Sequence, residues 1–181
     1  MTQSVQDRVR SVPHEVNRLE VAVGEPFDVF CARYESAVPE FDAKRFAQLA
    51  KDKADWDTVL QATSENAPHD FIIYWSQDFG PVMRLAGDER RCKEYLMGNH
   101  TIAQRMFHHN PAILLYAPLR TAIYDDTQGG TWFTVDQPST RFSSFGDPNI
   151  AKVGIELDQK LAALLEYLDL PVPEALTSHN A

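Results

Sequence analysis

The N-terminal third of the chain combines one strand pattern with three helix patterns. Apolar and polar residues alternate through most of residues 15–23, and this period of two predicts a strand. Residues 26–38 place a proline ahead of apolar positions at helical spacing, which predicts an amphipathic helix. Residues 42–53 and 55–65 also have helical spacing, so we expect two short accessory helices there.

Strand patterns dominate the middle of the chain. The aromatic and β-branched run at residues 71–75 is typical of a buried strand. Short turns separate four further strand candidates, which lie at residues 82–85, 92–97, 119–124 and 131–135. The polar, glycine-containing loop at residues 125–130 predicts a hairpin between the last two. Short loops between successive strands favour antiparallel pairing.

Two further helices complete the pattern. Residues 98–109 change to helical spacing, and either Asn99 or Thr101 can cap this helix. The longest apolar stripe occupies residues 148–168, with Asp147 as its cap and a proline at its first position. The order of elements predicts an α+β fold, in which a mainly antiparallel sheet packs against a long C-terminal helix.

The length of 181 residues suits one hydrophobic core. We expect a single α+β domain over residues 14–170. The polar, unpatterned residues 1–13 predict a flexible N-terminal arm, and residues 171–181 a C-terminal tail.

Charge and composition restrict the possible partners. The 26 acidic side chains outnumber the 17 basic ones, and the net charge of −9 opposes binding to the phosphates of nucleic acid. The N-terminus lacks the apolar segment of an export signal, and no apolar run reaches the length of a membrane span. Cys31 and Cys92 lack the spacing of a redox or metal motif. We therefore expect a cytoplasmic protein with reduced thiols that binds neither nucleic acid nor membrane.

Several short motifs, in a fixed order, resemble the domain of unknown function 302 family. A segment at residues 27–39 is similar to the opening helix of that family. The other motifs are YLMGNHTIA at residues 95–103, Pro111, YAPLR at 116–120, GGT at 129–131 and QPS at 137–139. The resemblance implies a TATA-binding-protein-like sheet-and-helix domain that is often a homodimer, and it implies no established reaction.

The chain departs from the family pattern at one position. Where that pattern reads Gly-Asn-Pro, this sequence has Gly98, Asn99 and His100. Proline suits the first position of a helix, where its missing N–H is not needed. The exchange for histidine loses this preorganisation and adds a group that can titrate or bind a metal. It is therefore either a functional change or neutral drift.

Three histidines, His100, His108 and His109, occur within ten residues. Imidazole can act as a base, a proton shuttle or a ligand of metal or haem. On a helix, His100 and His108 lie about 80° apart, and His109 points to the opposite side from His100. This differs from the i, i+4 spacing of a helical metal pair. Haem or metal binding through these histidines is one interpretation, and solvated or capping side chains are the other.

Tyr116 and Arg120 flank an Ala-Pro step at the start of a predicted strand. A guanidinium group there can hold a carboxylate or phosphate of a small ligand. The alternative is an ordinary ion pair of Arg120 with Glu35 or a nearby aspartate. The aspartate pairs at residues 55 and 57 and at residues 125 and 126 lack the spacing of a cation-binding loop.

These residues lead to a hypothesis of a small-molecule-binding or catalytic domain with a pocket between the sheet and the helices. The candidate catalytic residues are His100, Arg120 and Tyr124. The candidate ligand contacts are Asn99, His100, Tyr116, Arg120 and Trp132. No hydrolase or phosphate-loop motif occurs, so the sequence identifies neither a cofactor nor a reaction. The alternative hypothesis is a non-catalytic homodimeric scaffold or regulatory module.

Overall fold

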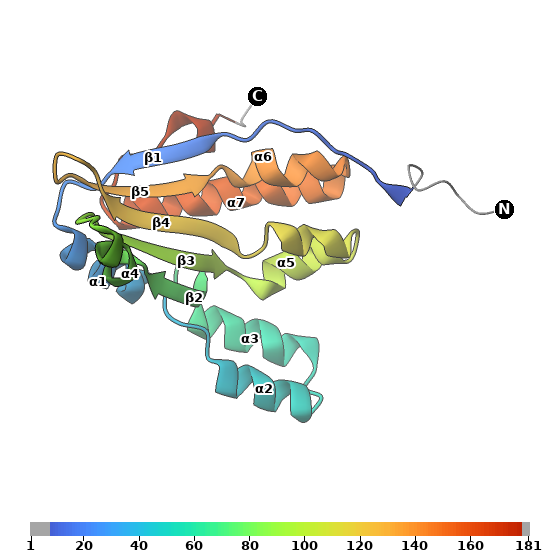
Figure 1. Cartoon of the computed structure of the whole chain (residues 1–181). Coiled ribbons are helices and arrows are strands. Elements are labelled where there is room, and N and C mark those ends of the chain that lie inside the picture. The colour runs from blue at the N-terminus through green and yellow to red at the C-terminus, as the bar shows by residue number, and fades with distance from the viewer. Residues whose placement is uncertain (1–7, 179–181) are drawn as a thin grey trace.

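Five antiparallel strands form one sheet in the order β1-β5-β4-β3-β2 (Figure 1). The computed structural model describes residues 8–178 of the chain. The strands are β1 (Arg18–Ala22), β2 (Ile72–Asp78), β3 (Cys92–Gly98), β4 (Leu119–Asp125) and β5 (Thr131–Asp136). The predicted α+β fold with a mainly antiparallel sheet is therefore confirmed.

Helices of very different lengths connect the strands and follow the last of them. The α-helices are α1 (Phe27–Ala37), α2 (Ala43–Lys51), α3 (Trp56–Asn66), α4 (Gly80–Met83), α5 (His100–Phe107), α6 (Pro138–Phe142) and α7 (Pro148–Tyr167). The short 3-10 helices are η2 (Arg84–Ala86), η3 (Pro111–Leu115), η4 (Ser143–Phe145) and η5 (Glu174–Leu176). The predicted long C-terminal helix is α7, and the Asp147 side chain caps it by accepting a bond from the backbone N–H of Asn149.

The core lies between one face of the sheet and the helices α1 and α7. Tyr34 of α1 is fully buried, and its hydroxyl lies 3.0 Å from Met97 Sδ on β3 and 3.3 Å from Thr121 Oγ1 on β4. Leu157 and Leu161 of α7 belong to the same buried cluster. Alternate residues of each strand face this layer, and the residues between them point to the opposite face of the sheet. Neither α1 nor α7 covers that opposite face.

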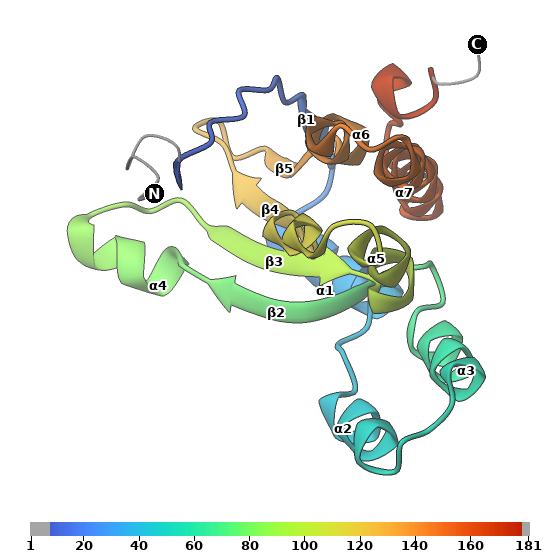
Figure 2. The same ribbon diagram turned by 90° about the vertical axis from the view of Figure 1, so that its right-hand side faces the viewer.

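The α2–α3 hairpin projects from the body of the molecule on the side of β2 (Figures 1 and 2). No residue of α2 is buried. A parallel bridge between Glu40 and Ile73 joins the segment ahead of α2 to the edge strand β2. The hairpin is therefore an accessory lobe, as the sequence predicts.

The strand predicted for residues 82–85 is wrong, because this segment belongs to the helices α4 and η2. Pro81 lies in the first turn of α4, where a missing N–H carries no penalty, and the chain turns on itself. The side chains of Val82 and Leu85 are exposed rather than packed on a sheet. The apolar residues of this segment therefore lie at the surface, and they do not alternate with polar residues as in a strand.

Segments near both ends of the described chain contact the body of the domain. Leu176 of η5, within the predicted tail, is fully buried. The His14 ring lies beside Tyr116, with 3.3 Å between His14 Nε2 and the tyrosine hydroxyl oxygen. Residues 1–7 of the predicted arm and the last three residues of the predicted tail lie outside the described residues. No helix in the described part of the chain is long and apolar enough to cross a membrane.

Candidate functional site

The face of the sheet opposite α1 and α7 carries most of the polar strand residues; we call it the open face. On β4 this face presents Arg120, Ala122 and Tyr124, because alternate residues share a face. The strand register then adds their partners on the neighbouring strands to the same face. These are Cys92, Glu94 and Leu96 on β3, Trp132, Thr134 and Asp136 on β5, and Arg18 and Glu20 on β1.

A cavity of about 490 Å³ opens on this face, where the strands meet η3 and α6; we call it the arginine cavity. Its polar residues are Arg120 on β4, Asp136 at the end of β5 and Arg141 on α6. Its other lining residues are apolar or aromatic: Leu96, Leu114, Leu115, Tyr116, Pro118 and Leu119. An apolar wall with a few convergent charged groups is the usual composition of a small-molecule site.

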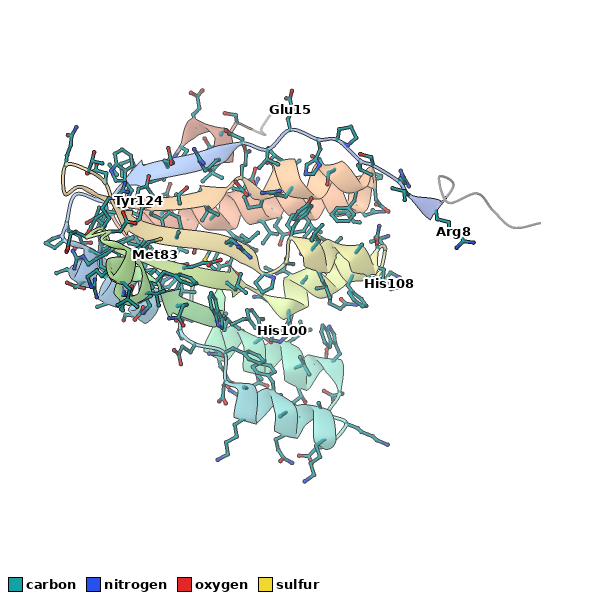
Figure 3. The ribbon with its side chains drawn as sticks, in the orientation of Figure 1. Arg8, Glu15, Met83, His100, His108 and Tyr124 are labelled. Carbon is teal, nitrogen blue, oxygen red and sulfur yellow. The ribbon has the colours of Figure 1, made fainter. Side chains whose placement is uncertain are left out.

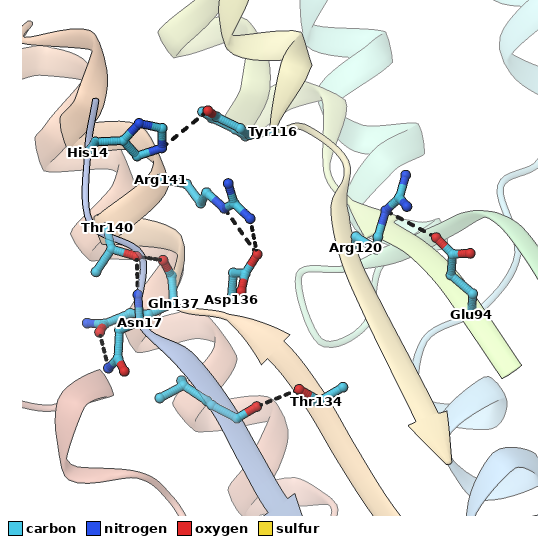
Figure 4. A network of polar contacts seen from close by, with 11 residues as sticks. His14, Asn17, Glu94, Tyr116, Arg120, Thr134, Asp136, Gln137, Thr140 and Arg141 are labelled. Atoms are coloured by element: carbon cyan, nitrogen blue, oxygen red, sulfur yellow. Dashed lines mark hydrogen bonds and ion pairs between the residues drawn. The ribbon is translucent and has the colours of Figure 1, made fainter. Parts of the chain in front are cut away.

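Both arginines of this cavity form ion pairs with acidic residues (Figure 4). Arg120 Nε lies 3.1 Å from Glu94 Oε1, and the arginine side chain is 75% exposed. Arg141 donates from Nε and Nη2 to Asp136, and its guanidinium stacks over the Tyr116 ring at 5.0 Å. Among the described residues, the two terminal nitrogens of Arg120 have no hydrogen-bond or ion-pair partner, whereas Arg141 interacts with both Asp136 and Tyr116.

The ion pair expected between Arg120 and Glu35 does not form. Glu35 lies on α1, on the core side of the sheet, and accepts hydrogen bonds from Lys93 Nζ (2.6 Å) and the Tyr95 hydroxyl (2.9 Å). Arg120 pairs instead with Glu94, its diagonal neighbour on β3, which lies on the same open face. The guanidinium group is therefore directed to the cavity and to solvent rather than to the core.

His100 is held by hydrogen bonds on both ring nitrogens at the junction of α3, β2 and α5 (Figure 3). The Thr63 hydroxyl donates to the Val59 carbonyl, so its oxygen can only accept from His100 Nε2–H at 2.8 Å. The other nitrogen, Nδ1, therefore accepts from the Tyr74 hydroxyl at 2.7 Å. Tyr74 in turn accepts from the backbone N–H of His100. These contacts specify one neutral tautomer.

Burial acts on both members of the His100–Tyr74 pair. It lowers the pKa of His100 below its ordinary value of 6.5, because the charged ring is poorly solvated there. Burial raises the pKa of Tyr74 to about 12, because this effect is larger than the opposite effect of the hydrogen bond from the His100 backbone N–H, which lowers the pKa. At neutral pH both groups are uncharged. The pair is suited to connecting elements, and neither group has a free position for proton transfer.

A smaller cavity of about 180 Å³ adjoins the arginine cavity; we call it the inner cavity. The two cavities share Leu114 and Pro118. The other lining residues of the inner cavity are Tyr74, Asn99, His100, Ala103 and Ala117. Asn99 caps α5 by accepting from the N–H groups of Thr101 and Ile102. Of the two cap residues that the sequence offered, Asn99 and Thr101, the structure has Asn99 as the cap.

The predicted site residues divide into three groups. Tyr116 and Arg120 line the arginine cavity, and Asn99 and His100 line the inner cavity. Tyr124 lies apart, at the far end of β4, where its hydroxyl donates to Glu20 at 3.2 Å. Trp132 donates from Nε1 to Asp126 at 2.8 Å and lines neither cavity. Four of the five ligand-contact candidates thus line the two neighbouring cavities, and Trp132 does not. Of the catalytic candidates, Tyr124 lies apart from His100 and Arg120.

The three histidines of the metal or haem hypothesis do not converge. His100 begins α5 and His108 follows its last turn (Figure 3), with His109 the next residue along the chain. His109 Nδ1 lies 3.8 Å from an Asp147 carboxylate oxygen. Within residues 8–178 no group of three or more His, Cys, Asp or Glu side chains is placed to hold a metal ion.

Sequence reasoning missed Asp136 and Arg141. Asp136 could have been found, because strand alternation from residue 131 places it on the face of residues 132 and 134. Arg141 lies on α6, which is too short for a helical period to be recognised. A fully buried carboxylate on α7, Asp158, anchors α6 by accepting from the backbone N–H of Ser139 at 2.9 Å.

The chain was compared with protein-family models and with solved structures. The model of the family named domain of unknown function DUF302 matches residues 47–168, well over half of the chain. The chain belongs to the DUF302 family. The DUF302 match begins within α2 and ends just after α7, so it includes β2–β5 and both cavities. It confirms the family resemblance of the sequence motifs.

A solved structure supports the DUF302 fold. The chain is similar to a crystal structure of an uncharacterized conserved protein DUF302 from Bacillus stearothermophilus, with a TM-score of 0.59 and 15% sequence identity. The similarity covers 82% of this chain and 95% of that protein. At this identity the likeness establishes the fold alone. Comparison with curated proteins gave no match.

Proposed function

We propose that the protein binds a small organic carboxylate in the arginine cavity. The observation that carries this proposal is the pair of unpartnered terminal nitrogens of Arg120 at the mouth of an apolar-walled cavity. A planar guanidinium group binds a carboxylate through two parallel hydrogen bonds. Arg141 adds a second guanidinium charge to the lining of the same cavity, although it is already engaged with Asp136 and Tyr116.

The contacts around His100 favour binding over catalysis in this proposal. A general base needs a nitrogen within hydrogen-bond reach of the substrate proton. Both ring nitrogens of His100 already bond to Thr63 and Tyr74. We therefore assign His100 to the support of the site.

Isothermal titration with a panel of butanoate, hexanoate and benzoate tests the proposal. We expect measurable binding of hexanoate or benzoate by the wild type. The Arg120→Gln variant should bind at least tenfold more weakly, because a hydrogen bond to a charged group contributes about 1.5 to 3 kcal/mol. Arg45→Gln is the matched control, since Arg45 forms an exposed ion pair with Glu65 on the accessory hairpin. Absence of binding, or equal binding by Arg120→Gln, would overturn the proposal.

A second candidate function is a homodimeric module that uses the β2 edge of the sheet. Beyond the bridge at Ile73, the outer edge of β2 pairs with no other strand among residues 8–178. Large apolar side chains are exposed along the segment from β2 to η2: Trp75, Val82, Met83 and Leu85. We propose a second copy as the occupant, because antiparallel pairing of two β2 edges about a twofold axis is self-complementary and covers these side chains.

A further inference from the structure

We infer that the carboxylate carries a medium-length aliphatic chain, which passes Leu114 and Pro118 and ends in the inner cavity. This inference rests on the proposed function, because the arginine cavity holds the head of the same ligand. The two residues line both cavities, so the cavities are neighbours with a common wall. A ligand anchored at Arg120 can therefore extend along this wall away from the charged groups.

The polar groups that line the inner cavity are already paired. Asn99 Oδ1 caps α5, and Asn99 Nδ2 donates to the backbone carbonyl of Asp70 at 2.9 Å. The Tyr74 hydroxyl bonds to His100 Nδ1 and to the His100 backbone N–H, and His100 Nε2 bonds to Thr63. A polar ligand group placed here would lose its water without gaining a partner. The inner cavity is therefore selective for hydrocarbon.

The common wall is held against the sheet by a close backbone contact. A Cβ added at Gly98 would lie 3.2 Å from both Cα and Cβ of Pro118. Glycine at this position therefore allows Pro118 to lie directly on β3. Leu114 lines both cavities and yet is 54% exposed. An aliphatic chain that runs between them covers this leucine, and the burial of apolar surface favours binding.

The geometry thus defines two ends of one ligand site. The charged end offers guanidinium nitrogens, and the far end offers apolar walls and saturated polar groups. An aliphatic monocarboxylate has this distribution of polarity. A dicarboxylate or a sugar acid does not, because each would place a polar group at the far end.

Chain-length dependence of binding tests this inference. Hexanoate, octanoate, decanoate and dodecanoate are titrated below their micelle concentrations into the wild type and into Ala103→Leu, which fills part of the inner cavity. We expect the wild-type affinity to rise about fourfold for each added methylene from hexanoate to decanoate. In Ala103→Leu the rise should stop at a shorter chain, while hexanoate affinity stays within twofold of wild type.

Two controls separate the possible outcomes. Ala47→Leu makes the same change at an exposed position of α2 and should leave the chain-length profile unchanged. The smaller change Ala103→Val repeats the test if Ala103→Leu does not fold. Equal profiles for the wild type and the variants at residue 103 would overturn the inference, while Arg120-dependent hexanoate binding would still support the proposed function. Absence of binding by every carboxylate would overturn both.

Discussion

His100 shows how one side chain can join three elements. Its ring bonds to α3 through Thr63 and to β2 through Tyr74, while its backbone begins α5. The rings of Phe41 and Phe46 lie 5.9 and 4.7 Å from it, in edge-on geometry. A proline at this position would offer neither nitrogen. The departure from the family pattern therefore coincides with the attachment of the α2–α3 hairpin.

The pKa of His100 predicts a pH dependence of stability. Burial lowers the folded-state pKa below the ordinary 6.5, so below about pH 6.5 the unfolded chain binds the proton more readily. The contribution of His100 to the free energy of unfolding is fully present above that pH and is lost as the pH falls. Urea unfolding at pH 7.5 and 5.5 should show a smaller pH effect in His100→Gln than in the wild type. The exposed His108 gives the control His108→Gln, and equal pH effects in all three proteins would contradict the prediction.

Secondary structure was predictable wherever an element was long enough to show a period. The stripe of α7 and the alternation of β4 and β5 are examples, because each buries one face against the core. The elements that form the arginine cavity are different. Helices η3 and α6 have five residues each, so neither repeats a pattern. Their position depends on tertiary contacts, and this is why Arg141 and the cavity escaped prediction while Arg120 did not.

The attachment of α6 to α7 depends on Asp158. This fully buried carboxylate accepts from the Ser139 backbone at 2.9 Å and from Gln137 Nε2 at 2.8 Å. Asp158→Asn replaces one of the two acceptor oxygens by an NH2 group. This new donor would face the N–H of Ser139 or of Gln137, which is itself a donor. We expect a loss of about 1 to 3 kcal/mol in the free energy of unfolding, measured by urea denaturation. Asp147→Asn is the control, because asparagine caps a helix as well as aspartate does. Equal losses in the two variants would show that Asp158 is not such an anchor.

At the scale of the whole molecule, the β2 edge predicts self-association. Sedimentation equilibrium at micromolar concentrations should give twice the mass of one chain for the wild type. Leu85→Glu places a charge on a side chain that is 89% exposed in a single copy, and it should shift the equilibrium towards monomer. Leu60→Glu makes the same change on the accessory hairpin and should leave the mass unchanged. A strictly monomeric wild type would exclude the dimer proposed here.

The pairing of β1 with β5 has a consequence for synthesis on the ribosome. Arg18 lies opposite Asp136, so the first strand of the sheet has its partner more than 100 residues later in the chain. Translation of that interval takes on the order of ten seconds. Leu19 and Val21, which are buried in the finished sheet, emerge long before the strand that covers them. The sheet is therefore completed only after residue 136 has been synthesised, and β1 must be kept from other partners until then.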